Sequence, residues 1–288
     1  MGKKTIAFIG TGVMGASIVK HLLRAGHSVH IFTRTAEKAQ PLVELGAIWH
    51  DSPKSAAQQG AIIFTMVGYP SDVEEVYFGN DGIFEAAQAG KIVIDMTTSQ
   101  PVLAKKIAQF AQTKEMASLD APVSGGDIGA QNGSLSLMVG GRREIFDQMI
   151  PIFEVFGKNI VYQGNAGAGQ HTKMCNQIAI ATNMIGVAEA LAYGKKAGLD
   201  LEQVLKSIEA GAAGSWSLSN LGPRMMKEDV APGFYIKHFL KDMRIALEEA
   251  AIMKLQLPGL TLAKKIYDEL SAEGMDDFGT QAIMTYYK

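Results

Sequence analysis

Near the start of the chain lies the stretch that decides the fold, Thr5-Ile6-Ala7-Phe8-Ile9-Gly10-Thr11-Gly12-Val13-Met14-Gly15. Its first five residues have the length and apolar, β-branched character of a buried parallel strand. The glycines that follow form the pattern Gly-x-Gly-x-x-Gly, and residues 16–25 carry apolar side chains at helical spacing. A strand that passes through such glycines into a helix is typical of a dinucleotide site, because the backbone can turn tightly there and approach a pyrophosphate at the helix start. An ordinary βα turn is the alternative. The predicted cofactor contacts are Gly10, Thr11, Gly12, Val13, Met14 and Gly15.

The second predicted strand, 29–33, bears on which dinucleotide is preferred. Sites for NAD usually end this strand with an Asp or Glu that accepts the ribose 2′-hydroxyl. Here the strand ends in Thr33-Arg34-Thr35, with no carboxylate before Glu37. A planar guanidinium suits a 2′-phosphate, so we predict NADP in preference to NAD, with Thr33, Arg34 and Thr35 as further contacts. The alternative is that Arg34 is a solvated loop residue.

Composition limits the class of protein. The chain has 288 residues, 47% of them hydrophobic, which is enough for two domains with substantial cores. A net charge of −2 favours neither nucleic acid nor an anionic membrane as a partner. The single cysteine and the spacing of the six histidines indicate no metal site. The start of the chain lacks the pattern of a signal peptide, and no apolar run approaches the ~20 residues of a membrane span. We therefore expect a cytoplasmic protein.

The pattern of the chain changes near Gly164. Before it, strand and helix signals alternate, which predicts a doubly wound parallel sheet of the Rossmann type over residues 1–164, covered by helices on both faces. After it we find only helical patterns and predict an all-α domain over 165–288, joined to the first by a long helix. The predicted strands are 5–9, 29–33, 61–67, 91–95, 116–120, 135–140 and 159–162. The principal predicted helices are 101–114, 170–196, 200–210, 215–227, 237–254 and 258–271.

Three further stretches could carry chemistry. Ser124-Gly125-Gly126 follows a strand end, where ligands of such sheets bind, and offers a hydroxyl and open backbone N–H groups to a carboxylate; a simple turn is the alternative. Lys173, Asn176 and Gln177 share one face of the long helix, so an amine and two amides could meet one small polar substrate. Taken alone, Lys173 would be interpreted as a surface lysine.

The third stretch is Lys241-Asp242, which lies among apolar residues and is predicted either to form a buried ion pair, to contact the cofactor, or to be a solvated pair. Two other residues are predicted to have ordinary roles. We expect Cys175 to be packed. Trp216 could line a substrate pocket, but a place in the core is the commoner outcome.

These motifs, in this order, resemble the β-hydroxyacid dehydrogenase family, which includes 3-hydroxyisobutyrate dehydrogenases, tartronate semialdehyde reductases and, more distantly, 6-phosphogluconate dehydrogenases. The resemblance covers essentially the whole chain and is strongest to uncharacterised bacterial oxidoreductases of that family. It implies that Lys173 is the catalytic acid/base, and that the substrate carboxylate binds at Ser124, Gly125 and Gly126. It further implies a site in the cleft between the domains and a homodimer or homotetramer formed through the all-α domain. The remaining implied contacts are Asn176, Gln177 and Lys241 for the substrate, and Val67, Thr98, Lys241 and Asp242 for the cofactor.

Two positions depart from the family pattern: Thr11 replaces the usual leucine of the glycine turn, which should be tolerated, and the second departure affects the substrate site. Many members place the substrate-binding Asn four residues after the lysine, where this chain has Gln177, so which amide meets the substrate is left open. The predicted function is hydride transfer between a nicotinamide cofactor and a small β-hydroxyacid or its semialdehyde. Two alternatives remain, an imine reductase and a non-catalytic NADP-binding interaction module; the presence of Lys173 argues against both.

Overall fold

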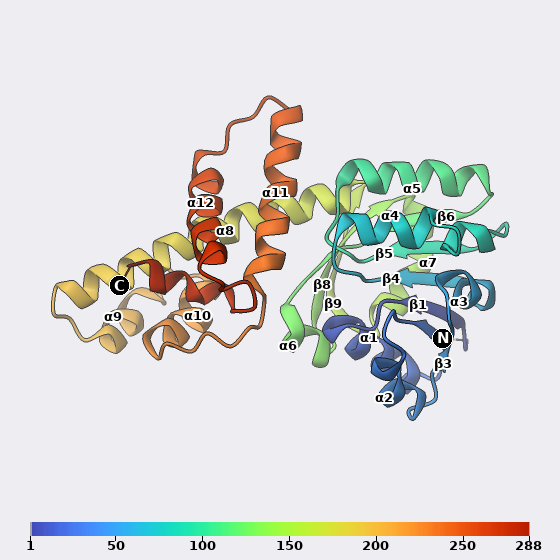
Figure 1. The fold of residues 1–288 in the computed structure, drawn as a ribbon, viewed down its shortest axis with the longest axis horizontal. Helices are drawn as coiled ribbons and strands as arrows, with labels where there is room; N and C mark the ends of the chain where they lie inside the picture. The colour runs from blue at the N-terminus through green and yellow to red at the C-terminus, as the bar shows by residue number, and fades with distance from the viewer. Residues whose placement is uncertain (1, 288) are drawn as a thin grey trace. The chain divides into compact units, whose positions relative to one another are not determined.

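The structure of the chain is a computed structural model that describes residues 2–287 (Figure 1). The chain divides into two compact units, one ending at Lys173 and the other beginning at Met174. Among the described residues no helix is both long and apolar enough to cross a membrane.

The first unit is built on one sheet of nine strands, whose order is β3-β2-β1-β4-β5-β6-β8-β7, with β9 beside β8. From β3 to β6 all neighbours are parallel, as helical crossovers require. The predicted fold class is confirmed, with one difference: β8 runs antiparallel to β6 and β7, so this edge of the sheet is mixed. The two unpredicted strands, β3 and β7, have two residues each, too few to show a period. The strands are β1 Thr5–Ile9, β2 Ser28–Phe32, β3 Ile48–Trp49, β4 Ile62–Thr65, β5 Ile92–Asp95, β6 Ala117–Asp120, β7 Val123–Ser124, β8 Leu135–Gly141 and β9 Gly157–Gly164.

Both faces of this sheet are covered by helices, and each face has its own core. Along β1 the side chains alternate: Ile6 and Phe8 pack into one core, whereas Ala7 and Ile9 pack into the other. The first core is completed by α1, α2, α6 and α7, and the second by α3, α4 and α5. Figure 1 shows α4 and α5 side by side on the second of these faces. The helices are α1 Val13–Arg24, α2 Gln40–Val43, α3 Pro53–Gln59, α4 Pro70–Phe78, α5 Pro101–Thr113, α6 Gly126–Gln131 and α7 Arg143–Phe153, with short 3₁₀ turns η1 Ala36–Ala39 and η2 Ile83–Ala86.

The second unit is helical. Within the described residues after β9 the only extended pairing is an isolated bridge between Tyr235 and Gly279. The predicted helices are present with ends shifted by a few residues, and two begin at side chains that cap them: Asp200 accepts from two backbone N–H groups of α9, and Ser215 from one of α10. The final 3₁₀ segment was not predicted. The elements are the part of α8 Ala168–Lys196 that follows Lys173, and α9 Leu201–Ile208, α10 Trp216–Met226, α11 Ile236–Ile252, α12 Pro258–Ala272 and η3 Thr280–Tyr287.

Candidate functional site

The turn between β1 and α1 leaves an open helix start. The helix begins at Val13, three residues earlier than predicted, so Gly12 is its N-cap; no side chain caps it, and its first turn carries no acidic residue. A β-carbon built on Gly12 would meet nothing within 4 Å, whereas on Gly15 it would lie 2.1 Å from the carbonyl oxygen of Gly10. Gly10 adopts a φ of +98°, which favours glycine. The backbone therefore needs two of the glycines for its own packing, and the third leaves space for a ligand.

Two other groups at this turn fit a cofactor. The hydroxyl of Thr11 is buried and has no hydrogen-bond partner among the described residues. A β-carbon on Gly10 would lie 3.0 Å from the Val67 side chain, so Val67 adjoins the turn, while its backbone N–H donates to the Thr97 hydroxyl at 3.0 Å. Thr98 follows in the segment between β5 and α5. An open helix N-terminus beside an unpaired buried hydroxyl is suited to the phosphates of a dinucleotide.

Arg34 is 80% exposed and lies just after β2, next to Thr33 and Thr35. Its Nη1 pairs with Oδ1 of Asp72 at 3.1 Å, and Oδ2 of Asp72 accepts from the backbone N–H of Tyr69 at 3.0 Å. The sequence interpretation missed Asp72, because 38 residues separate it from Arg34. Asp72 ties the guanidinium to the start of α4 and leaves the other nitrogens exposed.

The Ser124–Gly126 segment turns from β7 into α6. Ser124 is half-buried and pairs with Ser136 of β8, and Gly125 is exposed with a φ of +127°. Gly126, with a φ of +63°, begins α6. Asp127 follows in the first turn of that helix, and its negative charge would oppose the binding of a carboxylate there. Its Oδ1 accepts from the N–H of Ile128 at 2.8 Å.

Lys173 is buried, with 7% of its surface exposed, which excludes the surface-lysine interpretation. Its Nζ donates to the backbone oxygen of Val123 at 2.9 Å. The ammonium is thus held directly against the residue that precedes Ser124. A buried lysine that touches the candidate carboxylate loop is well placed to exchange a proton with a substrate.

In the second unit α8 continues into a polar chain. Asn176 Nδ2 donates to Gln177 Oε1 at 2.7 Å, and Gln177 Nε2 donates to Asp242 Oδ2 at 2.6 Å. Lys241 Nζ lies 2.8 Å from Asp242 Oδ1, and both side chains are buried. Lys241 and Asp242 therefore form the buried ion pair, one of the three predicted outcomes. Asn176 is half-buried and Gln177 is fully buried.

Two predictions about ordinary residues were wrong. Cys175 is exposed, because it lies one position from the buried Met174 and so points to another side of the helix. Trp216 is 68% exposed and belongs to no core, because it occupies the first position of α10.

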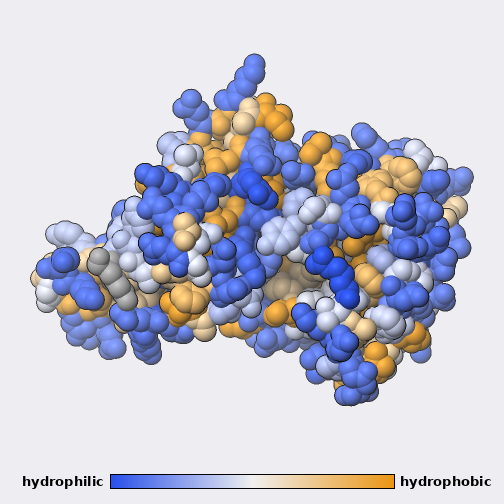
Figure 2. Space-filling view, in the orientation of Figure 1, coloured by the Kyte–Doolittle hydropathy of each residue, from blue (hydrophilic) through white to orange (hydrophobic). Residues whose placement is uncertain are grey.

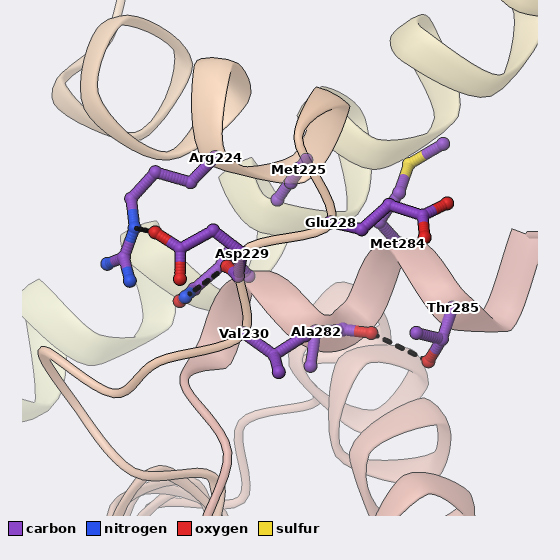
Figure 3. Close-up of a pocket in the computed structure, with 9 residues that line it drawn as sticks. Arg224, Met225, Glu228, Asp229, Val230, Ala282, Met284 and Thr285 are labelled. Carbon is purple, nitrogen blue, oxygen red and sulfur yellow. Dashed lines mark hydrogen bonds and ion pairs between the residues drawn. The ribbon is translucent and has the colours of Figure 1, made fainter.

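The structure also contains a pocket of about 200 Å³ in the second unit, shown in Figure 3. Arg224 and Asp229 in its lining are paired with each other, Nε to Oδ2 at 2.8 Å, and the neutral amide of Gln281 donates to the backbone oxygen of Asp229 at 2.9 Å. None of the predicted site residues lines it. We assign this pocket no part in the chemistry.

The start of α8 is tied to the sheet by buried polar groups that the sequence interpretation left unassigned. Asp120, at the end of β6, accepts from the backbone N–H groups of Gly167 and Gln170 at 2.8 and 2.9 Å. The Gln170 side chain in turn bonds the backbone of the segment that follows β5. The sequence shows that both residues are present, but it does not show their partners, which lie 47 to 73 residues away along the chain.

Asp95 ends β5, beside Asp120 in the register of the sheet. Its Oδ1 accepts from the Thr65 hydroxyl at 2.7 Å and from the Thr97 N–H at 3.1 Å. Burial raises the pKa of Asp95 to about 6, although these hydrogen bonds oppose the rise. The carboxyl end of the sheet therefore carries a protonatable carboxyl group that is linked by hydrogen bonds through Thr97 to Val67, which adjoins the turn between β1 and α1.

Comparison with known proteins places the chain in a family. A family profile described as the NAD binding domain of 6-phosphogluconate dehydrogenase matches residues 5–164, and one described as NAD-binding of NADP-dependent 3-hydroxyisobutyrate dehydrogenase matches residues 167–287. The uncharacterized oxidoreductase YkwC of Bacillus subtilis is 62% identical, with 98% of each chain covered. The 2-hydroxy-3-oxopropionate reductase of Escherichia coli is 38% identical over 97% of this chain and 95% of that protein.

Solved structures agree with this placement. The 3-hydroxyisobutyrate dehydrogenase of Mycobacterium tuberculosis, with L-serine, has a TM-score of 0.92 at 28% identity and covers 100% of both chains. An imine reductase from Myxococcus stipitatus is more distant, with a TM-score of 0.66 at 19% identity, and shares the fold alone. Since the two profiles span most of the chain and both relatives match it along nearly its whole length, the chain belongs to the β-hydroxyacid dehydrogenase family of NAD(P)-dependent oxidoreductases.

Proposed function

We propose that the chain is an NADP-preferring oxidoreductase that interconverts a small β-hydroxyacid and its semialdehyde, with Lys173 as general acid/base. The observation that carries the proposal is the burial of the Lys173 ammonium against Val123, next to the open backbone of Ser124–Gly126. A relative named 2-hydroxy-3-oxopropionate reductase acts on a compound of this class, and L-serine, present in the Mycobacterium tuberculosis structure, is itself a small β-hydroxyacid.

The residues of the turn between β1 and α1, Gly10 to Gly15, which we call the nucleotide turn, would hold the cofactor, which supplies hydride transfer at the nicotinamide. The free N–H groups at the start of α1 would bind the pyrophosphate, and the Thr11 hydroxyl would donate to it. Arg34, pre-oriented by Asp72, would bind the 2′-phosphate that distinguishes NADP from NAD. The profile matched by residues 167–287 is named for NADP-dependent enzymes, which supports this preference.

Lys173 would give a proton to the substrate carbonyl oxygen during reduction and take it back from the hydroxyl during oxidation. Ser124 and the backbone N–H groups after it would hold the substrate carboxylate and so orient the reacting carbon. Of the two amides, we assign Asn176 to the substrate, because Gln177 is buried and its amide group already bridges Asn176 and Asp242.

The test is oxidation of NADPH, and separately of NADH, with glyoxylate, succinic semialdehyde, tartronate semialdehyde and methylmalonate semialdehyde. We expect turnover with at least one of them and a higher kcat/KM with NADPH. Butanal is the matched control for succinic semialdehyde, because it has the same chain length without the carboxylate. Equal turnover of the two would remove the role of Ser124–Gly126, and turnover of a cyclic imine alone would favour an imine reductase. Binding of NADPH without turnover of any substrate would favour the non-catalytic module.

We also propose that the helical unit forms a homodimer or homotetramer in the cytoplasm. Four large apolar side chains are exposed around the turn from α11 to α12, and Figure 2 shows apolar surface there. Such a patch on one unit indicates a protein interface. Light scattering after size exclusion should give a dimeric or tetrameric mass, and a monomer at micromolar concentration would refute this. The four residues are Ile252, Met253, Leu255 and Leu262.

A further inference from the structure

The carboxylate of Asp120 occupies the start of α8. The first N–H groups of a helix have no partner inside it, and Asp120 accepts two of them, from Gly167 and Gln170. Its negative charge lies at the positive end of the helix dipole. Burial raises the pKa of Asp120, and the backbone hydrogen bonds from Gly167, Gln170 and Gly169 counteract that rise. Asp120 is thus a helix cap supplied by a distant strand.

Two glycines make room for this carboxylate. A β-carbon on Gly140 of β8 would lie 2.6 Å from Asp120 Oδ1, and one on Gly169 of α8 would lie 2.9 Å from Oδ2. The Gly169 β-carbon would also lie 2.3 Å from the backbone oxygen of Met138. The backbones of β8 and α8 therefore approach Asp120 more closely than any side chain would permit.

Gln170 is the second anchor, and it is completely buried. Its Nε2 donates to the Thr97 oxygen at 2.7 Å, and its Oε1 accepts from the Ser99 N–H at 2.9 Å. Lys173 lies three residues farther along the same helix. Val123, which accepts the Lys173 ammonium, lies three residues after Asp120. The segment 120–123 thus bonds both to the start of α8, through Asp120, and to the Lys173 amine on α8, through Val123.

We propose that Asp120 and Gln170 are positioning residues for proton transfer: they fix α8 on the ends of β5 and β6 so that the Lys173 ammonium is held at Val123. The assignment rests on the role proposed for Lys173. Because a helix is rigid over a single turn, loss of either anchor displaces the amine. A displacement of about 1 Å at a reacting group can cost roughly 10²-fold in rate.

The principal test is Asp120→Asn, which keeps the size of the side chain but directs an NH₂ group at a backbone donor. We expect kcat to fall about 10- to 100-fold, with KM for NADPH changed by less than about twofold, because the nucleotide turn is untouched. Amide hydrogen exchange over residues 167–173 should accelerate by about tenfold or more. Acetylation of Lys173 by an amine-reactive ester, followed by peptide mass spectrometry, should accelerate in the same way relative to the exposed Lys206.

Gln170→Met provides a second variant in case Asp120→Asn does not fold, since Met keeps the length and loses both hydrogen bonds. The matched control is Asp200→Ala, which removes an aspartate cap from α9 and should leave kcat unchanged. Unaltered exchange and Lys173 labelling in a folded Asp120→Asn or Gln170→Met would overturn the positioning role. If Lys173→Met retains turnover while both probes still respond to Asp120→Asn, the anchor stands and the role proposed for Lys173 fails.

Discussion

Two helices, α1 and α8, begin at the same end of the same sheet, but their N-termini differ. The backbone N–H groups at the start of α1 have no side-chain cap, whereas those at the start of α8 do. At α1 the cap is Gly12, no side chain fills the space, and the first turn carries no carboxylate. At α8 the corresponding N–H groups are taken by the buried carboxylate of Asp120. An open helix start is available to an anion from solution, whereas a filled one is an anchor. The difference separates the part of the molecule that would bind a cofactor from the part that would hold a catalytic group still.

The largest effect is expected at the anchored helix. Lys173→Met keeps the apolar stem and removes the exchangeable proton, so kcat should fall by ~10²–10⁴-fold. NADPH affinity, measured by fluorescence titration, should be nearly unchanged, because the nucleotide turn is intact. Lys206→Met, on the exposed side of α9, is the control and should retain wild-type kcat. Turnover close to wild type in Lys173→Met would mean that burial of the lysine serves packing alone.

The second largest effect is expected when a side chain fills the open start of α1. Gly12 has space around it and a φ of −68°, so Gly12→Val should fold normally yet occupy the space proposed for the pyrophosphate. Each charge-assisted hydrogen bond is worth roughly 1.5–3 kcal/mol, so losing two should weaken NADPH binding by about 100-fold or more. Gly15→Ala is the contrasting variant. Its β-carbon would clash with the Gly10 carbonyl, so it should lower the melting temperature as well. A Gly12→Val protein that binds NADPH normally would place the cofactor elsewhere.

At the end of the sheet where α8 is anchored, Asp95 should make the stability of the folded chain depend on pH. Its pKa rises from 3.8 to about 6 in the folded chain, so between these values the folded chain retains a proton that the unfolded chain has released. Stability therefore falls as pH increases through this window, by up to roughly 3 kcal/mol. Chemical denaturation of wild type and Asp95→Asn across this range should show the loss in wild type only. Parallel curves for the two proteins would contradict it.

The smallest effect is expected at the exposed arginine. Arg34→Asp removes a charge-assisted contact worth roughly 1.5–3 kcal/mol, so NADPH affinity should fall about 10- to 100-fold while NADH affinity stays equal or improves. Asp72→Asn sharpens the test, because it frees the guanidinium without removing it and should leave NADPH preferred. Equal NADPH affinity in wild type and Arg34→Asp would remove the basis for preferring NADP.

The open helix start was predictable because its determinants are local. The glycines at 10, 12 and 15 follow a strand within a dozen residues, and the turn needs no distant partner to be recognised. The anchored start was not predictable in the same way. Asp120 and Gly167 are 47 residues apart, and Gln170 and Thr97 are 73 apart, so no periodicity links them. Lys173 shows the consequence: taken apart from the family resemblance it would be interpreted as a surface lysine, and only the tertiary structure shows that it is buried and donates to the Val123 oxygen.

The sequence by itself determined the class of the fold, the glycine-rich turn between β1 and α1 and the change to helices near Gly164, because each depends on patterns of neighbouring residues and on short motifs. Tertiary structure alone decided which charges are buried and with what partners. It placed Asp72 against Arg34, Asp120 at the start of α8, and Asp242 between Gln177 and Lys241. The physical reason is that a buried polar group must be satisfied by whichever partner the packed chain brings within about 3 Å, and that partner can come from any distance along the sequence.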